Sequence, residues 1–206
     1  MRRSNGVNIA VFASGSGTNF QALIDRVKDG YIPARIALLV SDNKDAYAVE
    51  RAQKAGIETF ILSPKGFKSR EAYDKEIIKK LKSKEVGLVA LAGFMRLISG
   101  HFAKEYKNKI LNIHPALLPA FKGTHGVRDA IRYGVKVTGP TVHFVDEELD
   151  HGPIVLQDAV SVSEDDTEES LRNKVHRKEY EVYPKAVKLF VEGKLKIEGR
   201  RVRIIE

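Results

Sequence analysis

The sequence contains no cysteine, which excludes disulfide bonds, thiolate nucleophiles and cysteine-ligated metal sites. No apolar run reaches the roughly 20 residues that a membrane-spanning helix needs, and the N-terminal stretch is too short for a secretory signal. Six histidines remain as conceivable metal ligands, but none are spaced as His-x-x-x-His or a similar helical pair. We therefore expect a cytoplasmic protein that has no bound metal and does not contact a membrane.

Size and charge narrow the class further. A chain of 206 residues, 43% of them hydrophobic, predicts one folded domain over residues 1–206. The net charge of +8 could attract nucleic acid, but Lys and Arg are interleaved with Glu and Asp along the expected helices. The most basic stretch, residues 184–206, lacks the series of aromatic side chains that stacks bases. We expect small anionic substrates, no nucleic-acid partner, and either a monomer or a homodimer.

Buried strands and amphipathic helices alternate along the first half of the chain. This alternation predicts an α/β fold with a mainly parallel, open twisted sheet and helices on both faces, in a Rossmann-like arrangement. The expected strands lie at residues 7–13, 36–40, 59–62, 88–92 and 109–114, and the expected helices at residues 20–27, 46–55 and 70–82.

The pattern changes in the second half. Residues 137–144 and 154–162 predict two longer strands, which could be antiparallel, and residues 171–189 carry the apolar stripe of a long helix. A small hairpin is expected near residues 195–204. We assign nucleotide or phosphate binding to residues 7–110 and catalysis to residues 111–206.

A glycine-rich turn, Gly15-Ser16-Gly17-Thr18-Asn19, joins the first strand to the first helix. Backbone N–H groups, a hydroxyl and an amide could close around a phosphate at this helix N-terminus. The alternative is a tight turn in which Thr18 or Asn19 caps the helix. The turn is not a Walker A loop, and Phe20 stands where a dinucleotide-binding turn has its third glycine.

Polar side chains follow the apolar run that ends at Leu111. Asn112 and His114 are two residues apart and should project to one face of their strand, while Asp150 precedes Gly152 in a turn. His114 could be an interior histidine, and Asp150 could simply shape its turn. Their co-occurrence at neighbouring strand ends favours one crevice that stabilises an oxyanion and moves a proton.

Several segments together carry a resemblance to a known family. In order along residues 7–190, the chain resembles the phosphoribosylglycinamide formyltransferases of purine biosynthesis. The Asn-x-His and Asp elements alone are typical of the wider group of formyl-folate transferases and hydrolases. The segments that carry the resemblance are Ser14–Asn19, Ala92–Arg96, Asn112–Pro115 with Leu117–Pro119, and Val142–Asp150.

The resemblance implies that a formyl group passes from 10-formyltetrahydrofolate, as co-substrate, to the amine of glycinamide ribonucleotide by direct amine attack. It implies that Asn112 and His114 stabilise the oxyanion and that Asp150 assists proton transfer. It assigns the ribonucleotide phosphate to Gly17, Thr18 and Asn19, and the ribose or glycinamide end to Glu179. The residues implied for the folate pocket are Arg70, Met95, Arg96 and Leu97, together with the loop that begins at Val145 and Asp146 and runs to Asp150.

Some readings stay open. From the residues alone, Arg70 could be a first-turn helix residue, Met95 could belong to the core and Glu179 could lie on a solvated helix face. His176 stands where some relatives have glutamine, and the Phe121–His125 segment replaces a commoner aromatic-Pro-Gly stretch. These departures leave the roles of His125 and His176, and the mobility of the two loops, undecided.

Three rival functions are compatible with parts of the pattern. A formyltetrahydrofolate hydrolase usually has an N-terminal regulatory domain, whereas six residues precede the first expected strand here. A methionyl-tRNA formyltransferase adds a C-terminal nucleic-acid-binding barrel, for which the residues after Phe190 are too few. A nucleotide-binding regulatory module without turnover is the third alternative.

Overall fold

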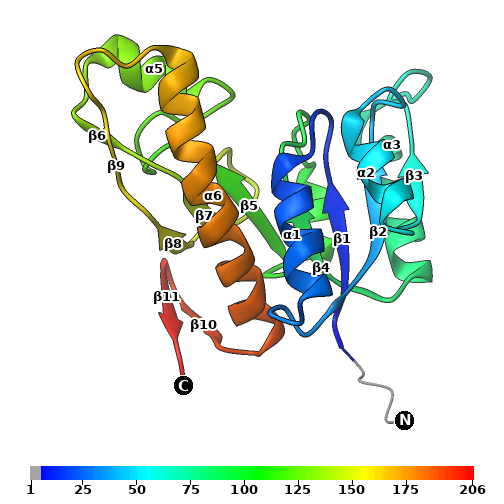
Figure 1. Cartoon of the computed structure of the whole chain (residues 1–206). Coiled ribbons are helices and arrows are strands. Elements are labelled where there is room, and N and C mark those ends of the chain that lie inside the picture. Colours follow the sequence, from blue (N-terminus) through cyan, green and yellow to red (C-terminus); the bar gives the residue numbers. More distant parts are fainter. Residues whose placement is uncertain (1–5) are drawn as a thin grey trace.

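The computed structural model describes residues 6–206. Strands and helices alternate over most of the chain (Figure 1). The first half contains β1 (Asn8–Phe12), α1 (Thr18–Lys28), β2 (Arg35–Ser41), α2 (Tyr47–Lys54), β3 (Thr59–Ile61), α3 (Arg70–Ser83), β4 (Val86–Leu91), α4 (Gly100–Glu105) and β5 (Ile110–His114). The second half contains α5 (Gly126–Tyr133), β6 (Val137–Thr138), β7 (Thr141–Phe144), β8 (Ile154–Gln157), β9 (Val160–Ser161), α6 (Glu168–Val191), β10 (Leu195–Glu198) and β11 (Arg201–Ile204).

A nine-stranded sheet with the order β10-β11-β8-β7-β5-β4-β1-β2-β3 forms the centre of the molecule. The five strands β5, β4, β1, β2 and β3 are mutually parallel, and β7 is antiparallel to both of its neighbours, β5 and β8. The strands β10 and β11 form the predicted hairpin, and β11 pairs with β8 in parallel. The predicted fold class, mainly parallel with antiparallel strands in the C-terminal half, is confirmed. Because β1, β4 and β5 are parallel, the loops at their carboxyl ends meet at one edge.

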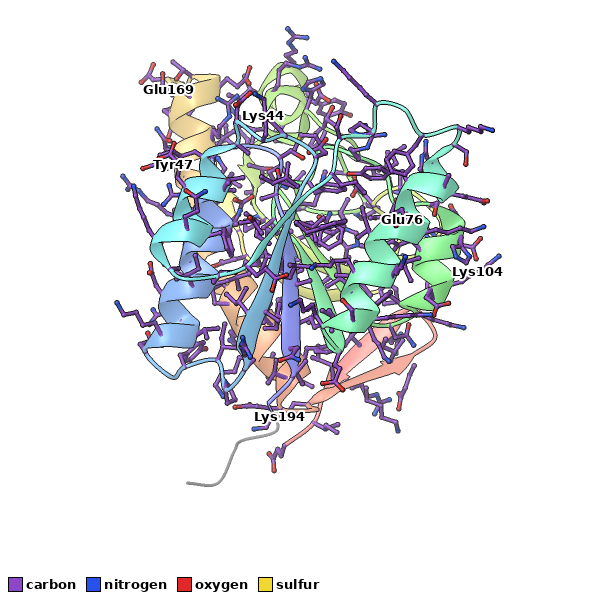
Figure 2. The ribbon with its side chains drawn as sticks, turned by 90° about the vertical axis from the view of Figure 1, so that its right-hand side faces the viewer. Lys44, Tyr47, Glu76, Lys104, Glu169 and Lys194 are labelled. Atoms are coloured by element: carbon purple, nitrogen blue, oxygen red, sulfur yellow. The ribbon has the colours of Figure 1, made fainter. Side chains whose placement is uncertain are left out.

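Helices cover both faces of the sheet because both faces are apolar. Along β1, Ile9 and Val11 face one core cluster with α1, α2 and α6, while Ala10 and Phe12 face a second with α3 and α4. Figure 2 shows the two layers, with Tyr47 of α2 on one side of the sheet and Glu76 of α3 on the other. A strand buried on both faces is continuously apolar, which is why β1 was predictable.

The predicted long strands at residues 137–144 and 154–162 are wrong in one respect, because each is interrupted. Gly139 has a φ of 147° and lies against Asp158, where an added Cβ would be 1.9 Å from the carbonyl oxygen. Pro140 has no N–H to donate to a ladder. The outer halves, β6 and β9, therefore leave the main sheet and pair as a separate two-stranded sheet.

Two short helices, α4 and α5, were not predicted. With 6 and 8 residues they span little more than two turns at most, and α5 has no side-chain cap at its N-terminus to mark its start. The long helix α6 begins with a capping box between Thr167 and Ser170, close to the acidic start that the sequence indicates. No helix within residues 6–206 is long and apolar enough to span a bilayer.

The helix α6 is fastened to the centre of the sheet. The buried Tyr183 hydroxyl lies 2.8 Å from the carbonyl oxygen of Leu91 and 3.1 Å from that of Leu111, the last residue before Asn112. Burial raises the pKa of Tyr183 well above its ordinary value, so the hydroxyl remains a donor at the junction of β4 and β5. This contact fixes the strand ends on which the candidate site is built.

Candidate active site

Asn112 and His114 lie on one face of β5. Alternation places Leu111 and Ile113 in the cluster under α1 and α6, so Asn112 and His114 project to the opposite face. His114 is buried, whereas Asn112 is partly accessible. The geometry that the sequence predicts for this pair is therefore present at the carboxyl end of β5.

Asp150 reaches the same place from a loop. Residues 145–153 join β7 to β8 and fold back over the sheet, because β7 runs antiparallel to β5 and ends near its start. The Asp150 carboxylate lies 3.4 Å from His114 Nδ1 and accepts a 2.8 Å hydrogen bond from the Gly123 N–H. The three side chains predicted to act together are thus neighbours, although Asp150 does not come from the same sheet edge.

The turn after Asp150 depends on Gly152. A Cβ at this position would lie 1.9 Å from the Phe144 carbonyl oxygen and 3.4 Å from the Asp146 nitrogen. Asp150 itself has a φ of 47°, a left-handed conformation that costs free energy for a residue with a side chain. Close packing of Gly152 against β7 therefore helps to hold Asp150 in place.

We expect Gly152→Ala to lower the free energy of unfolding by on the order of 1–3 kcal/mol and to reduce turnover, because the new methyl group displaces the loop. Urea denaturation measures the first effect and steady-state kinetics the second. Gly15→Ala is the matched control for stability, since a Cβ there would meet nothing within 4 Å. Equal stability of the two variants would contradict the prediction.

His143 completes the site, and the sequence analysis did not single it out. It is 1% exposed, pairs with Asn112 across β5 and β7, and its Nε2 lies 3.1 Å from Asn112 Nδ2. Its Nε2 is also 3.6 Å from the Asp150 carboxylate. A histidine inside the otherwise uncharged buried strand of residues 141–144 was the available signal, but only the strand register shows its partner.

The hydrogen-bond partners define where protons lie. A carbonyl oxygen can only accept, so the 2.8 Å contact with the Phe144 oxygen places a proton on His143 Nδ1. With the proton on Nδ1, His143 accepts at Nε2 from one N–H of Asn112. The second N–H of the Asn112 amide is left to donate to a ligand.

The same reasoning applies to His114. Its Nε2 is 2.9 Å from the Phe121 carbonyl oxygen and must carry a proton, so Nδ1 of the neutral ring points a lone pair toward Asp150. A proton placed between His114 Nδ1 and Asp150 would be stabilised by both groups. The pair is therefore arranged to receive one proton.

The pKa values of the pair agree with this arrangement. Burial lowers the pKa of His114 below its ordinary 6.5, although the Asp150 carboxylate and the Phe121 carbonyl act against it. Burial favours a raised pKa of Asp150, but its contact with His143 and the hydrogen bond from Gly123 outweigh burial, so this pKa lies below 3.8. At neutral pH, Asp150 is ionised and His114 is mostly neutral.

The glycine-rich turn forms the N-terminus of α1. Gly17 has a φ of 65°, and an added Cβ would lie 2.7 Å from the Ala48 Cβ, so glycine is required there. No side chain caps α1, which rules out the alternative that Thr18 or Asn19 serves as its cap. The first N–H groups of the helix are therefore available to an anion.

Asn19 and Glu179 link the turn to α6. Asn19 Nδ2 donates to Glu179 Oε2 at 2.8 Å, and His176 Nδ1 lies 2.8 Å from the same oxygen. Glu179 is 2% exposed, so the alternative of a solvated helix residue is wrong. Two donors on one carboxylate oxygen leave Oε1 to accept from a ligand.

The residues predicted for a folate pocket come from three segments: the start of α3 (Arg70), the loop after β4 (Met95–Leu97) and the loop after β7 (Val145, Asp146). Met95 and Leu97 are 65% and 51% exposed, so the alternative of a core methionine is wrong. The Arg96 guanidinium lies 5.2 Å from the ring centre of Tyr73, and Val145 packs on the cluster under α3. Arg70 is exposed in the first turn of α3. Asp146 is engaged by His151 within its own loop, at 2.8 Å.

Two cavities lie beside the glycine-rich turn and the end of β5. The larger, of about 420 Å³, includes Thr18, Arg51 and Tyr180 in its lining. The smaller, of about 130 Å³, includes Pro115, His125 and His176. His125 and His176 therefore share one cavity next to the residue that follows His114. Among the described residues no group of three or more His, Asp or Glu side chains is arranged to hold a metal ion.

Comparison with known proteins identifies the family. Residues 7–187 match the formyl transferase family. The chain is 46% identical to phosphoribosylglycinamide formyltransferase of Bacillus subtilis, covering 87% of this chain and 92% of that protein. This chain belongs to the phosphoribosylglycinamide formyltransferase family. The family assignment makes it an enzyme, a formyltransferase.

A second curated relative and a solved structure support the same family. The Escherichia coli phosphoribosylglycinamide formyltransferase is 42% identical, over 93% of this chain and 90% of that protein. The crystal structure of glycinamide ribonucleotide transformylase 1 from Symbiobacterium toebii has a TM-score of 0.96 at 48% identity, over 99% of this chain and 96% of that one. The α/β architecture of this formyltransferase is thus that of its structurally known relatives.

Proposed function

We propose that this enzyme transfers the formyl group of 10-formyltetrahydrofolate to the primary amine of glycinamide ribonucleotide, in purine biosynthesis. The observation that carries the proposal is the convergence of Asn112, His114 and Asp150 at the end of β5, in a chain of this family. A cytoplasmic location, a monomeric or homodimeric state and the absence of a nucleic-acid partner stay predictions.

The reaction begins when the amine attacks the formyl carbon, which moves charge onto the formyl oxygen. Asn112 donates its second N–H to that oxygen, since the first is directed to His143. A neutral amide is suited to this role because its donor does not depend on pH.

The attacking amine becomes an ammonium and must lose a proton. Asp150 and His114 receive this proton between Oδ2 and Nδ1, directly or through water, which turns His114 into an imidazolium. The imidazolium stabilises the neighbouring oxyanion. As the tetrahedral intermediate collapses, the bond from carbon to the folate nitrogen breaks and the proton passes to that nitrogen.

His114 can donate to the oxyanion only if its present hydrogen bond is broken. Its Nε2–H is directed to the Phe121 carbonyl in this conformation, so it can donate to the formyl oxygen only after that carbonyl moves away. Phe121 has a φ of 50°, a left-handed conformation that costs free energy for a residue with a side chain. We propose that substrate binding moves the segment around Phe121 and transfers this hydrogen bond to the oxyanion.

The ribonucleotide is assigned to the side of the site that faces α1 and α6. Its phosphate accepts hydrogen bonds from the backbone of Gly17 and Thr18 at the start of α1. Asn19 holds the turn against Glu179, whose second carboxylate oxygen accepts from a ribose hydroxyl or the glycinamide N–H. Glycinamide ribonucleotide supplies both the anion and the donors that these groups require.

The formyl donor is assigned to the other side. Met95, Leu97 and Val145 offer apolar surface to its ring system, while Arg70 and Arg96 offer charge to its carboxylates. Asp146 lies in the loop that ends at Asp150, so the loop that contacts the donor also carries the proton acceptor. Binding of the formyl donor and positioning of Asp150 are therefore coupled.

We expect Gly17→Ala to raise the KM for glycinamide ribonucleotide about tenfold, which corresponds to about 1.4 kcal/mol of lost phosphate binding. The KM for the formyl donor should stay close to that of the wild type. Gly30→Ala is the matched control, because Gly30 also has a positive φ of 82° but meets nothing within 4 Å and lies outside the turn. A tenfold rise in the KM for the formyl donor alone would contradict the assignment.

The proposed function is tested by incubating the enzyme with 10-formyltetrahydrofolate, with and without glycinamide ribonucleotide. We expect tetrahydrofolate and formylglycinamide ribonucleotide to appear together, and only when both substrates are present. Release of formate without the amine would instead identify a hydrolase. No turnover would support a binding module.

A further inference from the structure

A chain of hydrogen bonds connects the loop that carries Asp150 to the C-terminal hairpin. Arg200, in the turn between β10 and β11, approaches His151 Nε2 at 2.9 Å with Nη1 and donates from Nη2 to the His151 carbonyl at 2.7 Å. On the other side of the ring, His151 Nδ1 lies 2.8 Å from Asp146 Oδ2. Arg200, His151 and Asp146 thus form one connected series.

The ring of His151 is held from two directions. Arg200 Nη1 lies 2.9 Å from Nε2 and 3.5 Å from Nδ1, so the guanidinium lies against the ring. The Asp146 carboxylate can only accept, so it accepts from the Nδ1–H. Glu148, with an oxygen 3.9 Å from Nδ1, is the other charged group near the ring.

The loop needs such support. Glu147, Glu148 and Leu149 are exposed, and Asp150 is held at a φ of 47°. Arg200 bonds the carbonyl of the residue directly after Asp150, and so acts on the backbone where the unfavourable dihedral is held. A displacement of about 1 Å in a catalytic group can cost on the order of a hundredfold in rate.

The hairpin is itself fixed next to the loop. Arg201, the first residue of β11, pairs with Ile154, the first residue of β8 and the second after Gly152 (Figure 1). The turn that carries Arg200 is therefore attached to the strand that follows the loop. Because the turn is fixed, the contacts of Arg200 with His151 restrain Asp146 and Asp150 as well.

We propose that Arg200 is a positioning residue that acts through His151, holding the 145–151 loop in the conformation that binds the formyl donor and places Asp150. The inference rests on the proposed function for the identity of the ligand. It gives the C-terminal hairpin, which contributes no group to the reaction, a part in the geometry of the site.

The test compares Arg200→Ala with Arg203→Ala, a matched control. Arg203 lies on the same hairpin and its Nε is 2.7 Å from Glu198, without a contact to the loop. We expect Arg200→Ala to raise the KM for 10-formyltetrahydrofolate about tenfold and to lower kcat, with the KM for glycinamide ribonucleotide and the urea midpoint unchanged. Arg203→Ala should match the wild type in both KM values and in kcat.

Arg200→Lys provides a second comparison. One ammonium group cannot reproduce the paired contacts of the guanidinium with the ring and the carbonyl, so we expect a partial rescue of kcat and KM. Equal losses in Arg200→Ala and Arg203→Ala, or equal rises in the KM for both substrates, would overturn the proposal. Either result would indicate a general role in stability.

Hydrogen–deuterium exchange keeps this test separate from that of the proposed function. In Arg200→Ala, the amides of residues 145–152 should exchange several-fold faster than in the wild type, without any substrate present. If the wild type shows no formyl transfer, the proposed function fails while exchange still decides whether Arg200 holds the loop. Unchanged exchange would overturn the positioning role whatever the activity.

Discussion

Replacing Asn112 by alanine is expected to lower kcat by about 10²–10³-fold, which corresponds to roughly 2.7–4 kcal/mol of transition-state stabilisation. The reason is the amide N–H that the His143 contact leaves available to the formyl oxygen. Because this donor matters most once negative charge develops, the KM values for both substrates should change little.

Steady-state kinetics with both substrates measure this effect. Asn8→Ala is a matched control, since Asn8 also lies on a central strand and its Nδ2 donates to the Lys84 carbonyl at 2.9 Å, remote from the site. Asn112→Asp removes the donor without leaving a cavity and should be as slow as Asn112→Ala. Wild-type turnover in Asn112→Ala would refute the oxyanion role.

The parallel half of the fold could be predicted from sequence because its signals are local. The first strand is apolar on both faces, and glycines mark the ends of the following helices at Gly30 and Gly56. Asn112 and His114 belong to the same class, because their shared face follows from alternation along one strand. Sequence patterns were therefore sufficient for features that depend on a single strand or helix.

The rest depended on contacts between distant segments. His143 joins the site only because β7 pairs with β5 in a register that aligns it with Asn112. The breaks near Gly139 and Asp158 result from two segments approaching each other closely, and an apolar run does not reveal this approach. The contact between Arg200 and His151 crosses 49 positions in the chain. Periodicity within one segment carries no information on such pairs.

The folate residues and Glu179 form an intermediate case. Their residue types gave no reason to prefer a binding role, and the resemblance to a family supplied it. The structure removes two of the alternatives to a binding role, since Met95 is exposed and not in the core, and Glu179 is buried with two donors and not solvated. Which ligand occupies each side stays a prediction that the Gly17 and Arg200 variants test.

Asp150→Asn is expected to lower kcat as much as Asn112→Ala does, or more. We expect kcat to fall by about 10²–10⁴-fold, because the amide cannot take up the proton that the attacking amine releases. The replacement is nearly isosteric, and the amide oxygen can still accept from the Gly123 N–H. The loop should keep its conformation, so the loss reports the carboxylate.

The pH dependence of kcat/KM should also shift in a defined direction in Asp150→Asn. In the wild type, kcat/KM should rise with pH as His114 loses its proton, along an acid limb set by a pKa below 6.5. The Asp150 charge favours the imidazolium and raises the pKa of His114, so removing that charge lowers this pKa further. The acid limb of the residual activity in Asp150→Asn should therefore move to lower pH.

A pH–rate profile of both proteins with saturating glycinamide ribonucleotide measures the shift. Asp158→Asn is the control, since it removes a carboxylate paired with Lys178 at 3.1 Å on the segment after β8 and leaves the site intact. An acid limb that moves to higher pH in Asp150→Asn would contradict the assignment of that limb to His114. Retention of wild-type kcat would remove Asp150 from the proton transfer, and the Asn112 amide would then remain as the supported catalytic group.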